Sequence, residues 1–429
     1  MPLLVGLYCV LTLLLIARVP IGAAPDEGPH LDYVEYLATR RALPVFQAAK
    51  APDYGYEFHQ PPLYYALCAP LWKATGTTVR PYLCRLVSLL CGALTLVLLW
   101  HSVVALFPHN RGLALVATSF AALWPLHQAV GASASNDALA GLICAAIFFI
   151  IARAATQDRG WQMRDVALLG VLIGLGLLTK TTCLVVGMVA VGAAWHVARL
   201  TSNSASDKGA AFRAAAVVTG VALLIGGWWL VRNQILYGDP LALGIFNAAF
   251  AQSSPGPAVF FAGGVSVLTY LRALLLILFC TAWGIFGGPN TAITVLNPFG
   301  VRGPSPAVLP ALGPMLICAV ATVAAVWGLW RWTKAWRSLP PASRVALAWW
   351  VIGFCLVALA WIQFNTRYFQ AQARYFHPAL LPMALAAALG WWHVFPVERR
   401  SARWLGVALL GATLLGLTLW NVFGWRTLV

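Results

Sequence analysis

Charged residues are scarce in this sequence. They make up 9% of its 429 residues, whereas 61% are hydrophobic and the mean hydropathy is +0.79. Soluble domains carry about 25% charged residues. A water-soluble globule cannot bury this much apolar surface, so the composition excludes ordinary soluble classes and predicts a polytopic membrane protein.

Three further features are missing. The apolar runs do not alternate with polar residues, as the strands of a membrane barrel would, but continue over roughly twenty residues, which is the length of a spanning helix. The nine cysteines contain no Cys-x-x-Cys pair, so neither a disulfide framework nor a thiolate zinc site is indicated. The basic residues are dispersed among the spans, which excludes a nucleic-acid-binding face. The sequence therefore predicts an all-α membrane protein.

The hydrophobic runs predict about eleven to twelve transmembrane helices. Eleven are expected at roughly 3–23, 82–107, 112–132, 136–154, 165–179, 181–199, 214–232, 308–331, 344–363, 376–395 and 403–423. Basic residues concentrate in four short loops, near 153–164, 199–213, 331–344 and 399–403, and the positive-inside rule places these in the cytoplasm. Another apolar run, 268–287, is then re-entrant, interfacial or an extra span.

This topology predicts one transmembrane domain over 1–429, without a separate soluble domain. Its first segment lacks the basic start and the cleavage site of a signal peptide, so we expect a retained span. Two long segments face the extracytoplasmic side: a first loop at 24–80 that carries interfacial helices, and a second region at 233–307. The predicted location is the bacterial inner membrane, with the active site on the extracytoplasmic side.

Acidic residues are concentrated in the first outer loop. Six of the twelve acids of the chain lie between Asp26 and Glu57. Asp137 and Lys180 follow at expected outer turns, and Arg367 and Arg374 lie in the loop 364–376. Ionisable groups at the hydrocarbon boundary are costly and are functional candidates by default. Carboxylates can take a proton from a hydroxyl acceptor, and Arg and Lys can bind a phosphate leaving group.

Each of these residues also has a structural interpretation. Asp26 precedes a predicted helix from His30 and is equally a candidate N-cap. Asp137 is a candidate cap of the fourth span, and Lys180 and Arg374 are candidate lipid-headgroup anchors. The histidines, His59 among them, lack the spacing of metal ligands and are expected to be surface or packed residues. Whether the protein requires a divalent metal ion stays open.

Four motifs resemble the GT-C class of integral-membrane glycosyltransferases, which includes protein O-mannosyltransferases and aminoarabinose transferases acting on lipid A. They cover about residues 1–240, and their order and shared membrane side carry the likeness. The four are Pro25-Asp26-Glu27, His59-Gln60-Pro61-Pro62-Leu63-Tyr64-Tyr65, Ser135-Asn136-Asp137-Ala138-Leu139 and Gly174-Leu175-Gly176-Leu177-Leu178-Thr179-Lys180.

The resemblance implies a sugar transfer from a polyprenyl-phosphate donor to a hydroxyl of a glycan, lipid or protein, with inversion at the anomeric carbon. It implies Asp26 as the general base, and it places Glu27 and Asp137 in the catalytic set. Lys180, Arg374 and Arg367 are the candidates for the donor phosphate. The predicted substrate contacts are His59, Gln60, Tyr64, Asn136 and Tyr375.

Three other functions stay open at this point. A transporter or flippase for lipid-linked sugars would place its ionisable groups near the bilayer midplane and would show internal repeats. In this sequence the ionisable groups are expected at the outer rim of the membrane, and no repeat is visible. A ligase would use a diphosphate-linked oligosaccharide as its donor. A non-catalytic partner of the same fold would tolerate loss of both Asp26 and Asp137. The predicted partners are otherwise the bilayer, the lipid-linked sugar and the acceptor, with no certain cofactor.

Overall fold

The computed structural model describes residues 1–50, 54–157, 162–201, 208–250, 256–284, 308–396 and 398–424. Across these residues every regular element is a helix, which confirms the predicted all-α class. The part of the expected outer region from 285 to 307 lies outside the described residues, as does Asp53.

Among the described residues, seven helices are long and apolar enough to cross a membrane. An eighth span is formed if α5 (Arg111–Leu123) and α6 (Pro125–Gly131), which meet at 58°, are counted together. Pro125 opens α6, where its fixed φ and missing N–H suit a first helical turn but interrupt the preceding helix. The seven are α4 (Arg80–Leu106), α7 (Asn136–Thr156), α9 (Cys183–Thr201), α10 (Lys208–Tyr237), α15 (Val308–Thr333), α16 (Pro341–Asn365) and α18 (Arg400–Gly424).

The remaining expected spans are helices too, but shorter ones. These are α1 (Pro2–Arg18) with 17 residues, α8 (Met163–Leu177) with 15 and α17 (Leu380–His393) with 14. The ambiguous run at 268–287 forms α13 (Val267–Ala282), with 16 residues. At about 1.5 Å per residue such helices fall short of a hydrocarbon core about 30 Å thick. The count of seven to eight long spans is therefore lower than the eleven to twelve expected from hydropathy, which does not register where a helix ends.

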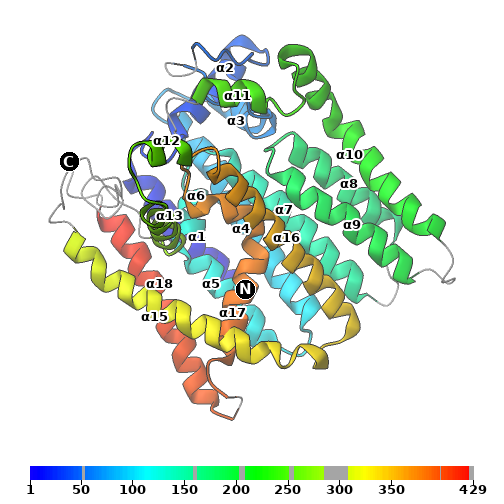
Figure 1. Ribbon diagram of the computed structural model, residues 1–429, viewed down its shortest axis with the longest axis vertical. Coiled ribbons are helices and arrows are strands. Elements are labelled where there is room, and N and C mark those ends of the chain that lie inside the picture. The colour runs from blue at the N-terminus through cyan, green and yellow to red at the C-terminus, as the bar shows by residue number, and fades with distance from the viewer. Residues whose placement is uncertain are drawn as a thin grey trace.

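Two helices lie in the first loop, α2 (Glu27–Arg40) and α3 (Leu63–Ala74), and they pack against each other. Two short helices, α11 (Leu243–Phe250) and α12 (Pro257–Ala262), lie in the second expected outer region. Figure 1 shows α2, α3 and α11 together at one end of the molecule, and the connection between α17 and α18 at the opposite end. A 3₁₀ turn η1 (Trp336–Ser338) joins α15 to α16, and a 3₁₀ segment η2 (Ala373–Ala379) precedes α17.

Helix α7 is the most deeply buried of the seven long helices. It packs against α4, α8, α9, α16 and η2, while α10 packs along α8 and α9 (Figure 1). Such a helix has little lipid contact, so polar groups at its N-terminus face protein. The first residues of α7 are therefore held rigidly among the loops that carry the other polar side chains.

Candidate active site

A cavity of about 430 Å³ opens between five segments of the chain. Its walls come from the start of α2, the loop 54–62, the α8–α9 turn, α11 and the segment from α16 to η2. Segments more than three hundred residues apart in sequence therefore share one site. Polar and charged side chains in its lining include Asp26, His30, Glu57, His59, Gln60, Lys180, Arg367, Gln372 and Arg374.

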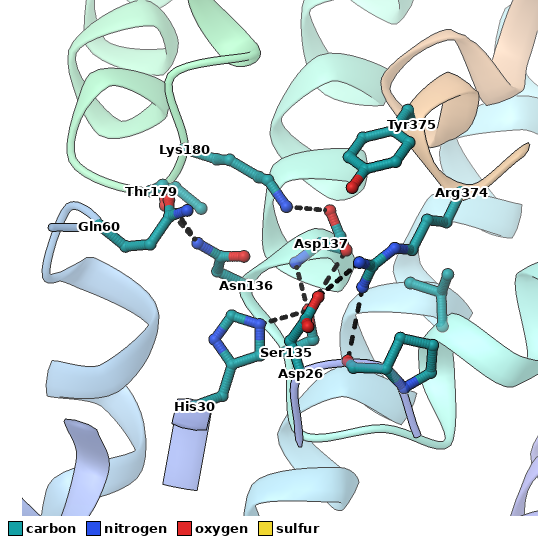
Figure 2. A network of polar contacts seen from close by, with 12 residues as sticks. Asp26, His30, Gln60, Ser135, Asn136, Asp137, Thr179, Lys180, Arg374 and Tyr375 are labelled. Atoms are coloured by element: carbon teal, nitrogen blue, oxygen red, sulfur yellow. Dashed lines mark hydrogen bonds and ion pairs between the residues drawn. The ribbon is translucent and has the colours of Figure 1, made fainter. Parts of the chain in front are cut away.

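Asp26 stands at the N-cap position of α2 but does not cap the helix. Its backbone is left-handed, with φ 60°, and its side chain makes no cap hydrogen bond. Instead the carboxylate pairs with the guanidinium of Arg374, which also donates to the Pro25 carbonyl at 3.4 Å (Figure 2). A left-handed non-glycine residue is costly, and such strain is held where the surrounding structure fixes it. Asp26 therefore does not cap α2, and it lines the cavity instead.

Ionisation of Asp26 is set by two opposing effects. Burial raises the pKa of its carboxyl, but the neighbouring Arg374 more than offsets this, so the net pKa is lowered. Asp26 is therefore a carboxylate at neutral pH, able to accept a hydrogen bond.

Asp137 and Lys180 form a second ion pair in the same site. The Lys180 ammonium lies 2.5 Å from Asp137 Oδ1, and both side chains are mostly buried. Burial alone would lower the pKa of Lys180, but the charge of Asp137 raises it, so the cation persists. The N-cap of α7 is Ser135, whose hydroxyl accepts from the Asp137 N–H at 3.2 Å. Asp137 is thus not the helix cap, and its carboxylate faces the site.

The other acid of the pair, Glu27, lies in a closed environment. Its two oxygens accept from Arg85 at 2.7 Å each, and both side chains are 0% exposed. The same oxygens also accept from the Gly22 N–H at 2.8 Å and the Ala134 N–H at 2.9 Å. With its acceptor positions used inside the protein, Glu27 joins the ends of α1, α2, α4 and the turn before α7.

His59 and Gln60 line the cavity, and Asn136 is hydrogen-bonded behind them. The Asn136 amide donates to the Thr179 carbonyl at 3.1 Å and to Gln60 Oε1 at 3.3 Å (Figure 2). Gln60 Nε2 in turn lies 3.1 Å from His59 Nε2. Burial lowers the pKa of His59 to about 4, so the ring is neutral. Three predicted substrate contacts are therefore connected, and His59 and Gln60 line the cavity.

His30 is part of the same network. Its Nδ1 lies 2.9 Å from the Tyr65 hydroxyl and its Nε2 lies 3.3 Å from Ser135 Oγ (Figure 2). Burial, and then the charge of Lys180, lower the pKa of His30 to about 3, so this ring is also neutral. No pattern in the sequence places His30 in a site rather than in packing, because its partners Tyr65 and Ser135 are 35 and 105 residues away.

The remaining predicted residues have different placements. Tyr375 lines the cavity, and its ring lies 5.3 Å from the Arg374 guanidinium carbon. Arg367 also lines the cavity but is exposed. Tyr64 is not among the lining residues. Its hydroxyl lies 2.9 Å from Ser88 Oγ and donates to the Cys84 carbonyl at 3.1 Å, so it joins α3 to α4 in the core. This placement gives the predicted substrate contact of Tyr64 no support.

A second cavity, of about 200 Å³, adjoins the first. The two share Pro25, Gln372 and Arg374 in their walls. The second is lined mainly by apolar residues of α1, of the connection from α1 to α2 and of α6, with Thr418 and Asn421 of α18. Asp137 also reaches it. A polar and an apolar compartment therefore meet at Arg374. Within the described residues, no three His, Cys, Asp or Glu side chains are grouped to hold a metal ion.

Comparison with known proteins supports the resemblance seen in the sequence. Residues 59–228 match the family described as dolichyl-phosphate-mannose-protein mannosyltransferase. No curated protein sequence matches the chain.

Three solved structures share its fold. ArnT from Cupriavidus metallidurans bound to undecaprenyl phosphate is 15% identical with a TM-score of 0.54, covering 96% of this chain and 63% of its own. The Archaeoglobus fulgidus oligosaccharyltransferase with Zn and sulfate is 14% identical with a TM-score of 0.56, covering 99% and 53%. The archaeal oligosaccharyltransferase AglB from Archaeoglobus fulgidus, with an inhibitory peptide and a dolichol-phosphate, is 13% identical with a TM-score of 0.52, covering 98% and 55%.

The chain thus spans about half to three fifths of the length of these solved proteins. At such identities the likeness concerns the fold, while the family match rests on 59–228. Together they confirm the predicted resemblance: this multi-pass membrane protein shares the fold of ArnT and of the archaeal oligosaccharyltransferase, and its residues 59–228 match the mannosyltransferase family.

Proposed function

We propose that this chain is a membrane glycosyltransferase that moves one sugar from a polyprenyl-phosphate carrier to a hydroxyl acceptor. The observation that carries the proposal is the placement of Asp26. A strained, partly exposed carboxylate lies in a cavity beside two cations, Arg374 and Lys180, and this cavity meets an apolar one. The family match at 59–228 supports the same reaction class.

The reaction needs three groups, and the site can supply each of them. Asp26 accepts the proton of the acceptor hydroxyl, whose oxygen forms the new bond to the anomeric carbon. The bond between that carbon and the phosphate oxygen breaks, and both of its electrons leave with the lipid phosphate. Arg374 and Lys180 stabilise the charge that develops on this leaving group. Attack opposite the leaving phosphate inverts the anomeric carbon.

The ion pair between Asp26 and Arg374 fits a resting state of this reaction. A donor phosphate competes for the guanidinium, which draws Arg374 away from Asp26 and makes the carboxylate a better base. Arg374 Nε is buried without a partner in the described structure, so part of the guanidinium is available to a ligand. Lys180 stays beside Asp137, which holds it at the cavity wall.

The apolar cavity suits the carrier lipid. Its walls are formed by α1, α6 and α18, and it ends at Arg374. A polyprenyl chain there would place its phosphate at the junction of the two cavities. The larger cavity then holds the sugar and the acceptor. We assign Glu27 a positioning role, because its pairing with Arg85 fixes the backbone next to Asp26 and leaves no acceptor oxygen for a substrate.

The site is proposed to face the extracytoplasmic side of a bacterial inner membrane. The connection between α17 and α18 lies at the opposite end from α2 and α3 (Figure 1). Arg399 belongs to this connection, and Arg400 and Arg403 belong to the first residues of α18. Basic short loops face the cytoplasm. The acceptor is a hydroxyl of a glycan, a lipid or a protein.

The proposal is tested by the glycan mass profile of the native host in which the chromosomal gene has been replaced. We expect Asp26→Asn, at wild-type protein level, to lose one glycan or to shorten it by one sugar, because the amide cannot accept the proton. The matched control is Asp32→Asn, an acid of α2 outside the cavity lining, which should leave the profile unchanged. The missing mass identifies the sugar.

Other outcomes would identify other functions. An unchanged profile for Asp26→Asn, in a strain whose deletion does change it, would favour a transporter or a non-catalytic partner. Accumulation of a diphosphate-linked oligosaccharide would favour a ligase.

A further inference from the structure

Glu57 differs from the other acids of the site because one of its carboxyl oxygens has no hydrogen-bond partner among the described residues. It lies in the loop between α2 and α3, is 4% exposed and lines the larger cavity. Its Oε2 is buried without a hydrogen bond in the described structure. Asp26 has Arg374, Glu27 has Arg85 and Asp137 has Lys180. Buried polar groups are normally paired, so an unpaired one that lines a cavity points to a ligand.

Charged side chains from several neighbouring segments surround Glu57 and set its pKa. Burial, followed by the negative charge of Asp26, raises the pKa of Glu57 to about 8, and Asp137 acts in the same direction. Lys180 and Arg374 oppose the rise but do not cancel it. The phenols of Tyr56 and Tyr65 also face this group, and both have raised pKa values, so they are neutral. At neutral pH most Glu57 side chains are therefore protonated.

We propose that Glu57 binds a hydroxyl group of the transferred sugar through a protonated carboxyl. This inference rests on the proposed function and adds a sugar-recognising residue to it. A protonated carboxyl presents one O–H donor and one free acceptor oxygen, which match a sugar hydroxyl. It also carries no charge to repel the donor phosphate that Arg374 and Lys180 bind.

The surroundings of Glu57 suit a sugar. Tyr56, His59 and Gln60 lie beside it in the loop and line the same cavity. Across the cavity, Trp361, Phe364 and Tyr368 add aromatic surface. Hydrogen-bonding groups on one wall and aromatic rings on another complement the polar edge and apolar face of a pyranose. A site that hydrogen-bonds a hydroxyl rejects analogues without it more strongly than an apolar pocket could.

The protonation state is tested on the purified full-length protein in lipid nanodiscs. Infrared spectroscopy resolves the C=O stretch of a protonated carboxyl group from that of a carboxylate. We expect the wild type to show this band at neutral pH, to lose it with a midpoint near pH 8, and Glu57→Gln to lack it. Glu35→Gln, an exposed residue of α2, is the matched control and should keep the band. Identical titrations of wild type and Glu57→Gln would overturn the proposal.

The sugar contact is tested by turnover in membranes that contain the endogenous donor and acceptor. We expect Glu57→Ala to lower turnover about 10- to 100-fold, while Glu57→Gln, whose amide still donates, falls less than about 10-fold. Wild-type turnover should decline above about pH 8 and that of Glu57→Gln should not, a difference that a purely structural role would not produce.

The two proposals fail in different ways. If Asp26→Asn is inactive and Glu57→Ala turns over like the wild type, the role of Glu57 is wrong and the proposed function stands. If Asp26→Asn is as active as the wild type, the proposed function is wrong, and the sugar contact fails with it.

Discussion

Asp26 and Glu27 are neighbours in the chain, and each pairs with an arginine, but the two ion pairs have different surroundings. The side chains of Glu27 and Arg85 are both 0% exposed, whereas those of Asp26 and Arg374 are 33% and 15% exposed. Glu27 begins α2, whereas Asp26 precedes the helix with a left-handed backbone, so one acid can face the protein interior while the other faces a cavity. The comparison separates an acid that holds the fold from one that is available to a ligand.

The buried ion pair of Glu27 and Arg85 also fixes the backbone on which Asp26 lies. Arg85 donates to the carbonyls of Ile16, Val19 and Pro20 at 2.7–3.0 Å, which ends α1 and directs the chain toward Asp26. Glu27 accepts from the Ala134 N–H, which lies three residues before Asp137. The closed pair thus fixes the two backbone segments that carry the predicted catalytic carboxylates, including the left-handed Asp26.

The largest effect on stability is expected from breaking the buried ion pair of Glu27 and Arg85. Glu27→Ala leaves the Arg85 guanidinium buried and without its carboxylate, which costs about 3–5 kcal/mol. We expect the purified variant in nanodiscs to unfold at a much lower temperature or to accumulate poorly in membranes. Measuring the apparent unfolding temperature by intrinsic tryptophan fluorescence checks this.

Glu27→Gln serves as the graded control, because it keeps the shape and one acceptor oxygen and should lose less stability than Glu27→Ala. A Glu27→Ala protein that unfolds like the wild type would contradict the structural role of this pair.

A smaller effect is expected from a substitution elsewhere that displaces Arg374 without replacing it. A Cβ at Gly141 would lie 2.3 Å from Nδ1 and Cε1 of His377, which is in η2 with Arg374. His377 is itself held by His127 at 3.1 Å, so the ring cannot swing away freely. We expect Gly141→Ala to shift η2, to cost about 1–3 kcal/mol and to lower turnover about tenfold. Turnover in membranes and the unfolding temperature check both parts.

The matched control for this change is Gly220→Ala in α10, where an added Cβ would have no neighbour within 4 Å. Gly220→Ala should leave turnover unchanged. Wild-type turnover in Gly141→Ala would show that the position of η2 does not control the site.

Much of the fold could be predicted from the sequence, because apolar runs of helical length report directly on the lipid environment. All eleven expected spans contain a helix, and Asp26, Asp137, Lys180 and Arg374 share one site. The lengths of α1, α8 and α17 could not be predicted in this way. Hydropathy averages over a window and misses an end such as Arg18-Val19-Pro20.

The pairing of charges could not be predicted either. Asp26 and Arg374 are 348 residues apart, and Glu27 and Arg85 are 58 apart. Which cation meets which acid depends on how the helices pack, and the sequence carries no periodic signal for it. Tyr64 and Tyr65 illustrate the same limit: Tyr65 contacts His30, while Tyr64 turns toward Ser88 of α4. Glu57 lies two residues before His59, where the predicted motif begins, and this proximity is the sequence signal that could have placed it in the site.

The smallest effect is expected for the stability of Asp26→Asn. Because the pair is partly exposed, removing its charge should cost no more than about 1 kcal/mol. The pKa of Asp26 is lowered, so its contribution to stability is present above the unfolded pKa of about 3.9 and is lost only as pH falls through the folded value. The difference in unfolding temperature between wild type and Asp26→Asn should therefore be small and constant between about pH 6 and pH 8.

Glu57 should behave in the opposite way, which gives the comparison an internal control. Its folded pKa of about 8 lies above the unfolded pKa of about 4.3. The contribution of Glu57 to folding stability is therefore complete below the unfolded pKa and is lost as pH rises through about 8. Glu57→Gln should therefore gain stability relative to the wild type as pH increases toward 8. Unfolding temperatures of the three proteins across this range distinguish the two acids. A loss in Asp26→Asn as large as that in Glu27→Ala would instead make Asp26 part of the scaffold.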